Sequence, residues 1–260
     1  DLPTSPILSQ KASEIAGTGV SFGESASCDM HVRDVQEMET GTVAQVEVAG
    51  ETLLYKIHTP GRHFAVNGAA VLAVCEAWEL DRALSLAALG QWRPGAGRGK
   101  TFTVSLDIAD TTATLTLIDD AYNANPASVG ASLAVLAAAP AQHDVGRVSR
   151  GRRIAVLGDM KELGPTGPQL HADLAALSAT QTLDQVHCVG ELMRNLHDAL
   201  PEAQRGVWCA TAAEMAEALP RRLDAGDVVL VKGSLSMGLA RVVDAIRDMG
   251  EGDAAAPREG

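Results

Sequence analysis

Two patterns of hydrophobic and polar residues divide the chain. Up to about residue 60, apolar side chains alternate with polar ones, as in "DMHVRDVQ" with Met30, Val32 and Val35, and "VAQVEVAGETLLYKI" predicts a hairpin that turns near Gly50. Residues 1–60 are therefore predicted to be rich in strands. The next stretch, "TPGRHFAVNGAAVLAVCEAWELDRALSLAALG", is rich in alanine and apolar on most sides, which predicts a buried helical segment.

The pattern changes after a turn-rich segment, "RPGAGRG". "FTVSLDI" and "ATLTLIDD" predict a second hairpin, and short apolar strands then alternate with amphipathic helices. Asn125 and Pro126 predict the N-cap and first turn of one helix, and Thr211 with Glu214 predicts the capping box of another. The strands are predicted in "RRIAVLGDM", "QVHCVG", "GVWCA" and "VVLVKGS", and further helices near 168–179, near 191–199 and beyond "VVLVKGS". This alternation predicts a Rossmann-like α/β domain, whose mostly parallel sheet is covered on both faces.

Composition narrows the class of protein. The 260 residues, 46% of them apolar, are enough for two domains with their own cores, and the net charge of −12 argues against a nucleic-acid partner. We interpret four arginines within 147–153 as a solvated loop. Cys188 and Cys209 lie in apolar strands, so we expect buried thiols and a reducing, cytoplasmic location. The longest apolar stretch is too short for a bilayer, so we expect neither membrane insertion nor a signal peptide.

The segment "RPGAGRGKTF" is similar to the phosphate-binding loop of ATPases but does not satisfy its pattern. Gly99, Lys100 and Thr101 fit the end of the pattern, whereas Pro94 occupies the position of its first glycine. The residues that follow alternate with a period of two, which predicts a strand. Since phosphate binding there requires a helix N-terminus, we exclude this type of loop.

Polar residues follow the predicted strands of the second half, where parallel sheets bind ligands. They are Asp119, Asp120, Gly158, Asp159, Gly190, Lys232, Gly233 and Ser234. Turn residues are needed at strand ends in any case. The pattern alone therefore indicates only a small-molecule-binding α/β domain.

Three segments closely resemble the Mur ligase family of ATP-dependent ligases. They are "LIDDAYNANPASVGASLAVL", "RIAVLGDMKELG" and "VVLVKGS", and upstream "PGRHFAVNGAAVLAV" and "RPGAGRG" are similar to the end of the family's central ATP-binding domain. The first two contain the motifs of the member that joins D-alanyl-D-alanine to UDP-N-acetylmuramoyl-tripeptide. The resemblance implies that ATP and Mg²⁺ activate the tripeptide carboxylate as an acyl phosphate, which the dipeptide amine attacks, in peptidoglycan precursor synthesis.

The resemblance also implies a domain organisation. Residues 1–93 would be the C-terminal part of the central domain, 94–101 a hinge linker and 102–249 the C-terminal Rossmann-like ligase domain, with a disordered tail at 250–260. The N-terminal domain and the first half of the central domain, with the phosphate loop and the metal ligands, would lie upstream. We therefore expect a monomeric fragment without ligase activity of its own, and no catalytic or metal-binding residue within it.

Site residues follow from the resemblance by position. His63 and Asn67 match a segment that contacts adenine, although Phe64 replaces its first asparagine. Arg98 and Asp120 match residues that reach the ribose, and a carboxylate suits hydroxyl donors. The remaining matches are Tyr122 near the nucleotide phosphates, Asn123 and Asn125 on a loop that faces the dipeptide, and Asp159, Glu162, His171, Lys232 and Ser234 on the substrate-facing edge.

Each assignment has a structural alternative. His63 and Asn67 fit a packed histidine and a cap, Asn125 fits an N-cap, and Glu162 fits a solvated side chain. His171 fits a packing residue, whereas a lysine at an apolar strand end requires an anionic partner. Two alternative functions are a different ligase of the superfamily and a nucleotide-binding module without catalytic activity.

Overall fold

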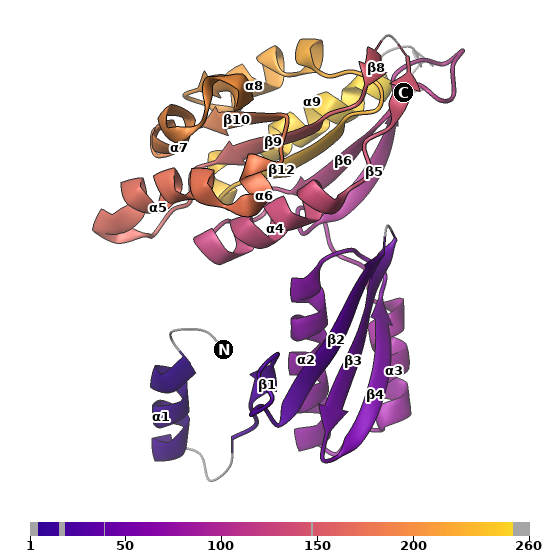
Figure 1. Cartoon of the computed structure of the whole chain (residues 1–260), viewed down its shortest axis with the longest axis vertical. Helices are drawn as coiled ribbons and strands as arrows, with labels where there is room; N and C mark the ends of the chain where they lie inside the picture. The colour runs from indigo at the N-terminus through magenta and orange to yellow at the C-terminus, as the bar shows by residue number, and fades with distance from the viewer. Residues whose placement is uncertain (1–4, 16–18, 39, 147, 252–260) are drawn as a thin grey trace, which may run out of the picture. The chain divides into compact units, whose positions relative to one another are not determined.

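The computed structural model describes residues 5–15, 19–38, 40–146 and 148–251 (Figure 1). The chain divides into two compact units, Asp1–Arg93 and Pro94–Gly260. The predicted hinge segment 94–101 falls in the second unit, where Lys100 already begins a strand. Of the predicted tail 250–260, residues 250 and 251 belong to the last helix, and residues 252–260 lie outside the described residues.

The first unit is a four-stranded sheet covered by two helices on one face. Its strands follow the order β1-β2-β3-β4, with β1 parallel to β2 and the other pairs antiparallel. The elements are α1 (Ser5–Ile15), β1 (Phe22–Gly23), β2 (Met30–Met38), β3 (Gly41–Val48), β4 (Glu51–Ile57), α2 (Arg62–Ala77) and α3 (Arg82–Gln91). The predicted hairpin is confirmed, because Ala49 and Gly50 both have positive φ and join paired residues Val48 and Glu51.

The prediction that residues 1–60 are rich in strands is confirmed by β1–β4, although residues Ser5–Ile15 form a helix. The predicted helical segment is confirmed as two helices, because Glu79 takes a positive φ and the Asp81 side chain caps α3 at Leu84 N. The prediction that this segment is buried on most sides was wrong. Only one face of α2 is buried, with Ala65, Ala69 and Leu72 among its buried residues, whereas Val71 and Trp78 on the same segment are exposed.

The second unit is a doubly wound α/β domain, as predicted. Its sheet has the order β11-β10-β9-β12-β6-β5, with every pair parallel except β5 and β6. The strands are β5 (Lys100–Ser105), β6 (Thr114–Asp120), β9 (Arg153–Gly158), β10 (Gln185–Val189), β11 (Arg205–Cys209) and β12 (Val228–Lys232). The first pair confirms the predicted hairpin. Because a strand rather than a helix follows Gly99, this segment is not a phosphate-binding loop of the ATPase type.

Helices cover both faces of this sheet (Figure 1). On one face lie α4 (Pro126–Ala138), α5 (Gly167–Asp173), α6 (Ser178–Gln181) and α7 (Arg194–Ala199), and on the other α8 (Ala212–Ala218) and α9 (Ala240–Glu251). The predicted caps are confirmed, since Asn125 accepts from Ser128 N and Thr211 accepts from Glu214 N. The predicted helix near 168–179 is interrupted, and short 3₁₀ turns separate its parts.

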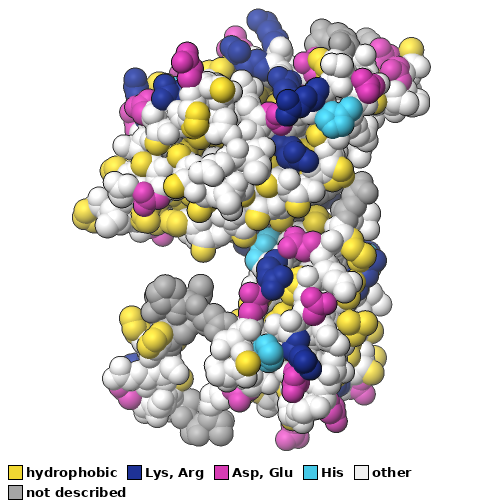
Figure 2. Space-filling view, viewed as in Figure 1, with side chains coloured by type: hydrophobic (Ala, Val, Ile, Leu, Met, Phe, Trp, Pro, Cys, Tyr) yellow, Lys and Arg dark blue, Asp and Glu magenta, His cyan; other side chains and the backbone are white. Residues whose placement is uncertain are grey.

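Two apolar clusters fill the two faces of this sheet. Val129, Leu133 and Leu136 of α4 pack on one face of the sheet, and Leu239 and Ile246 pack on the other. Cys188 and Cys209 are buried free thiols, and burial raises the pKa of both. None of the described helices is long and apolar enough to cross a bilayer. On the face drawn in Figure 2, acidic side chains lie among the basic ones on both units.

The interpretation of the arginine cluster as a solvated loop was wrong for Arg152. Its guanidinium forms two bonds with the carboxylate of Asp227, at 2.6 and 3.1 Å, and Arg152 N donates to the same carboxylate at 2.9 Å. The Asp227 side chain has no exposed surface. The Arg152–Asp227 ion pair fixes the amino end of β12.

Arg150 of the same cluster belongs to an unpredicted hairpin of β7 (His143–Val145) and β8 (Val148–Arg150), and Arg147 lies outside the described residues.

Replacing Asp227 tests the structural role of this pair. We expect Asp227→Asn to lower the free energy of unfolding by about 2–3 kcal/mol, because it removes the nearer and fully buried carboxylate of the Arg152 guanidinium and leaves only Asp224, at 3.5 Å. Arg150→Ala breaks a 2.7 Å pair with Asp184 in which the arginine is 73% exposed, so we expect a loss below about 1 kcal/mol. Denaturant unfolding measures both, and equal losses would contradict the assignment.

His187 on β10 is a buried imidazole with one unpaired nitrogen. Its Nδ1 accepts a hydrogen bond from Val207 N at 2.9 Å, so the proton lies on Nε2, which has no partner in the described structure. Burial, with Arg222 and Arg152 nearby, lowers the pKa of His187 from 6.5 to about 4. The folded chain therefore keeps this group neutral where the unfolded chain binds a proton, and the stability it contributes is lost as the pH falls from about 6.5 to about 4.

We expect the free energy of unfolding to fall by up to about 3 kcal/mol across this pH range because of His187. His187→Asn keeps an acceptor for Val207 N but does not titrate, so its stability should depend less on pH between 6.5 and 4. Urea unfolding at several pH values measures the difference. Parallel profiles for the two proteins would show that His187 does not carry the effect.

Candidate functional site

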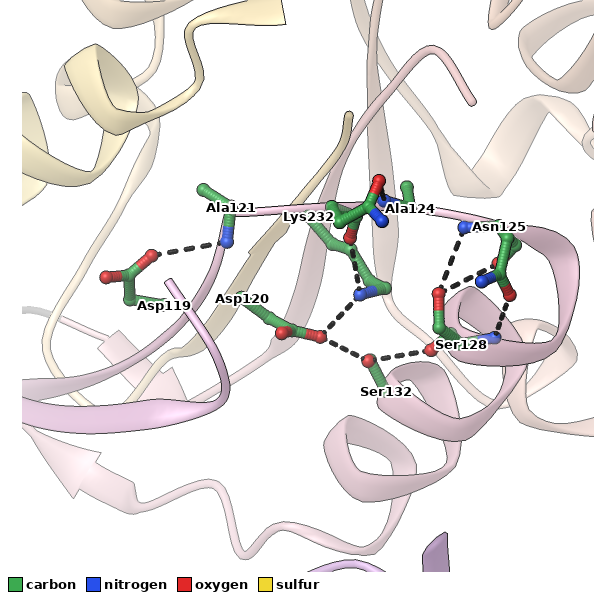
Figure 3. A network of polar contacts seen from close by, with 9 residues as sticks. Asp119, Asp120, Ala121, Ala124, Asn125, Ser128, Ser132 and Lys232 are labelled. Atoms are coloured by element: carbon green, nitrogen blue, oxygen red, sulfur yellow. Dashed lines mark hydrogen bonds and ion pairs between the residues drawn. The ribbon is translucent and has the colours of Figure 1, made fainter. Parts of the chain in front are cut away.

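The carboxyl ends of β6 and β12 meet in a buried ion pair. Lys232 Nζ lies 2.7 Å from Asp120 Oδ2, and it donates to the carbonyl oxygen of Asn123 at 2.9 Å (Figure 3). Ser132 Oγ on α4 donates to the same Asp120 oxygen at 2.6 Å. The lysine side chain is 4% exposed and the aspartate 18% exposed. The lysine therefore has the anionic partner that its burial requires.

The side chain of Asp119, the neighbouring acid, points away from that of Asp120 (Figure 3). Its carboxylate accepts Gly97 N at 2.9 Å and Ala121 N at 3.3 Å, and its carbonyl oxygen accepts Gly99 N at 2.8 Å. Gly97 has a φ of +71°, and a Cβ there would lie 3.0 Å from Tyr122 N. Asp119 therefore fastens the turn before β5 to the end of β6.

This fastened turn places Arg98 over Tyr122. The Arg98 guanidinium lies 4.0 Å from the centre of the Tyr122 ring, and both side chains are exposed. Such a pair offers an exposed cation on an aromatic face. Two residues that the resemblance assigns to the nucleotide thus lie together, and one of them, Tyr122, follows Asp120 by two positions in the chain.

The loop after β6 is ordered by asparagines. Asn123 Oδ1 accepts Ala124 N at 2.8 Å, while the Asn125 side chain caps α4 at 2.9 Å from Ser128 N. Both side chains are exposed. Asn125 therefore has the structural role of an N-cap, as anticipated.

The loop after β9 is held by three largely buried side chains. Asp159, 2% exposed, accepts Met193 N at 2.8 Å and Lys161 Nζ at 2.8 Å. Ser234 Oγ accepts Lys161 N at 2.9 Å. His171 Nε2 accepts Met160 N at 2.9 Å, so its Nδ1 carries the proton and donates to Gly167 O at 2.6 Å.

Because of these bonds, the side chains of Asp159 and His171 hold the loop together, and their bonded atoms are not free to face a ligand. Gly190 supports the arrangement, since a Cβ there would lie 2.5 Å from Asp159 Oδ1. Glu162, at the tip of the loop, is exposed and has a φ of +65°. Of the residues predicted for this loop, Glu162 is the one whose side chain is presented to solvent.

His63 and Asn67 belong to the first unit, one turn apart at the start of α2. The His63 ring packs on Phe64, with ring centres 4.0 Å apart, and Phe64 lies 5.6 Å from the Trp92 ring. Asn67 is exposed and His63 half-buried. The Phe64 that replaces an asparagine of the resembled segment is thus part of an aromatic cluster.

Comparison with known proteins identifies the family of this chain. The family model described as "Mur ligase, glutamate ligase domain" matches residues 106–235, half of the chain. The chain belongs to the Mur ligase family.

Relatives within the Mur ligase family carry a more specific name. UDP-N-acetylmuramoyl-tripeptide–D-alanyl-D-alanine ligase of Treponema pallidum is 31% identical over 76% of this chain and 41% of the relative. The ligase of the same name from Bacillus subtilis is 26% identical over 85% of this chain and 46% of its own length. The chain therefore spans less than half the length of these curated relatives.

Solved structures show the same fold. The MurF ligase of Thermotoga maritima, determined in complex with ADP, matches with a TM-score of 0.74 and 22% identity over 95% of this chain and 52% of that one. MurF of Acinetobacter baumannii matches with a TM-score of 0.69 and 23% identity over 88% and 46% of the two chains. The predicted α/β architecture of this Mur ligase family chain is thus confirmed.

Sequence reasoning missed two contributors to this edge of the Mur ligase domain, since Ser132 was one residue of an apolar helix and Lys161 was not singled out. Asp119 was named among the polar residues at the strand ends, but without a specific role. Ser132 lies one turn from Ser128 on α4, and this spacing from a cap was the available signal. The partners of Lys161 and Asp119 lie across loops, so no local pattern indicates them.

Replacing His171 distinguishes a loop anchor from a ligand-facing group. We expect His171→Phe to lower the free energy of unfolding by about 2–4 kcal/mol, because Met160 N and Gly167 O lose their partners in a buried place. The exposed His143 provides a control, and we expect His143→Phe to change stability by less than about 0.5 kcal/mol. Chemical denaturation measures both variants. Unchanged stability of His171→Phe would contradict the anchoring role.

Proposed function

We propose that the chain is part of an ATP-dependent ligase that adds D-alanyl-D-alanine to UDP-N-acetylmuramoyl-tripeptide in the cytoplasm. The names of the relatives from Treponema pallidum and Bacillus subtilis support this reaction, and the ADP complex of the Thermotoga maritima ligase supports the nucleotide. The observation that carries the proposal is the Asp120 carboxylate at the carboxyl edge of the sheet, where Lys232 and Ser132 bind one oxygen and no described residue donates to the other. Tyr122, two positions further along the chain, carries the exposed guanidinium of Arg98 on its ring.

The residues of this edge fit a nucleotide. Asp120 would accept ribose hydroxyls, because a carboxylate accepts O–H bonds and cannot donate them. Arg98 and Tyr122 would contact the same nucleotide, Arg98 near its ribose and Tyr122 toward its phosphates. For the first unit, taken by itself, we propose that Asn67 and the His63–Phe64 pair bind adenine, partly by stacking. ATP supplies the phosphoryl group that activates the tripeptide carboxylate for attack by the dipeptide amine.

The dipeptide-facing role is proposed for the exposed groups of the two loops. Asn123, Asn125 and Glu162 present polar side chains there, and Asp159, His171 and Ser234 hold the loop that carries Glu162. The proposed domain assignment is unchanged, with residues 1–93 in the ATP-binding domain and 102–249 in the ligase domain. The phosphate loop and the Mg²⁺ ligands are proposed to belong to other parts of a longer monomeric protein.

Replacing Asp120 in the full-length protein tests the proposal. We expect Asp120→Ala to raise the KM for ATP about tenfold, since it removes a hydrogen bond to a charged group, and to lower the ligation rate at limiting ATP. Asp198→Ala, at an exposed aspartate of α7, should leave both values unchanged. Phosphate release with both substrates is the measurement, and the 260 residues alone should release none. An unaltered KM and rate in Asp120→Ala would refute the role of this edge.

A further inference from the structure

One oxygen of the Asp120 carboxylate is fully engaged by the protein, and the other is not. Oδ2 receives Lys232 Nζ at 2.7 Å and Ser132 Oγ at 2.6 Å. Among the described residues, Oδ1 has no hydrogen-bond donor, and the side chain keeps 18% of its surface exposed. The two donors come from different elements, α4 and β12, and together they hold Oδ2 in place.

Lys232 is placed to act on Asp120 rather than on a ligand. Its side chain is 4% exposed, and two of its three N–H groups are used by Asp120 Oδ2 and Asn123 O. To reach a ligand, this nearly buried ammonium would have to leave Asp120, and the aspartate would then lose its counter-charge. The aspartate is the more exposed member of the pair and is the side that a ligand can touch.

From this geometry we infer that Lys232 and Ser132 are positioning residues that hold Asp120 with Oδ1 free to accept a ligand hydroxyl. The inference rests on the proposed nucleotide-binding role of Asp120 and replaces the expectation that Lys232 itself faces the dipeptide. A carboxylate held by two donors loses no further rotational freedom when a ligand binds, which is the advantage of a preorganised acceptor. Without the donors, Asp120 would turn between several orientations. The protein would then no longer bind ATP in preference to an analogue in which a hydrogen replaces a ribose hydroxyl.

Ribose selectivity distinguishes positioning from simple stabilisation. The full-length ligase is assayed with ATP, 2′-deoxy-ATP and 3′-deoxy-ATP, and the wild type should prefer ATP over at least one analogue. In Lys232→Met, which keeps the apolar stem in its buried place, we expect the KM for ATP to rise about tenfold and the preference for ATP to disappear. The kcat at saturating ATP and the KM for D-alanyl-D-alanine should stay within about twofold, since the dipeptide does not contact Lys232.

Two further variants keep the test decisive. Ser132→Ala removes one donor at a helix position that alanine favours, so it should fold and should reduce the preference about threefold. If Lys232→Met does not fold, Ser132→Ala decides alone, and an unchanged preference overturns the inference. Arg150→Met removes the cation of another 2.7 Å ion pair, with Asp184 at the amino edge of the sheet, and should change no kinetic value.

The remaining outcomes separate this inference from the proposed function. If Lys232→Met raises the KM for the dipeptide and keeps the ribose preference, Lys232 faces the dipeptide and the positioning role is wrong. If it lowers kcat with the preference retained, the pair only stabilises the fold. If the wild type ligates with no preference for ATP over either analogue, Asp120 does not contact the ribose and the inference fails. If the wild-type protein does not ligate at all, the proposed function and this inference fail together.

Discussion

The buried charge of Lys232 depends on the register of β12 between β6 and β9. In this register Lys232 lies opposite Asp120 on β6, while Val228 lies opposite Thr116. A shift of one residue would turn the lysine to the other face of the sheet. There its ammonium would be buried among the apolar side chains under α8 and α9. The register is also fixed at the amino end, where Asp227 binds Arg152. One strand therefore carries an ion pair at each end and only apolar residues between them, and it cannot slide without breaking both.

The same alternation separates the two acids of the Asp119–Asp120 pair. Successive residues of a strand point to opposite faces of the sheet, so neither carboxylate can replace the other in its contacts. Asp119 holds the turn that carries Arg98, and Asp120 stays at the edge with an oxygen free. Because Gly97 lies against Tyr122 with a positive φ, the turn has little freedom to move away. The bonds of Asp119 thus help to place the turn from which the Arg98 cation reaches the Tyr122 ring.

Local signals in the sequence predicted most of the fold. The caps at Asn125 and Thr211 and the apolar runs of the strands depend on neighbours within four residues, and each was confirmed. The break at Glu79 was missed because the segment stays rich in helix-forming residues across it, and only the backbone at Glu79 and the cap at Asp81 separate α2 from α3. The partner of Arg152 was missed because Asp227 lies 75 residues away.

The candidate site was predictable in residue type but not in the role of each residue. The resemblance selected polar residues at strand ends, and the structure divides them by what their atoms already bind. Asp159 and His171 spend their polar atoms on backbone groups and on Lys161, whereas Glu162 and Asp120 keep oxygens at the surface. A hydrogen bond made within the protein reduces what an atom can offer a ligand. The same residues that look alike in sequence therefore separate into a rigid frame and a few presented groups, and it is the frame that gives the presented groups their direction.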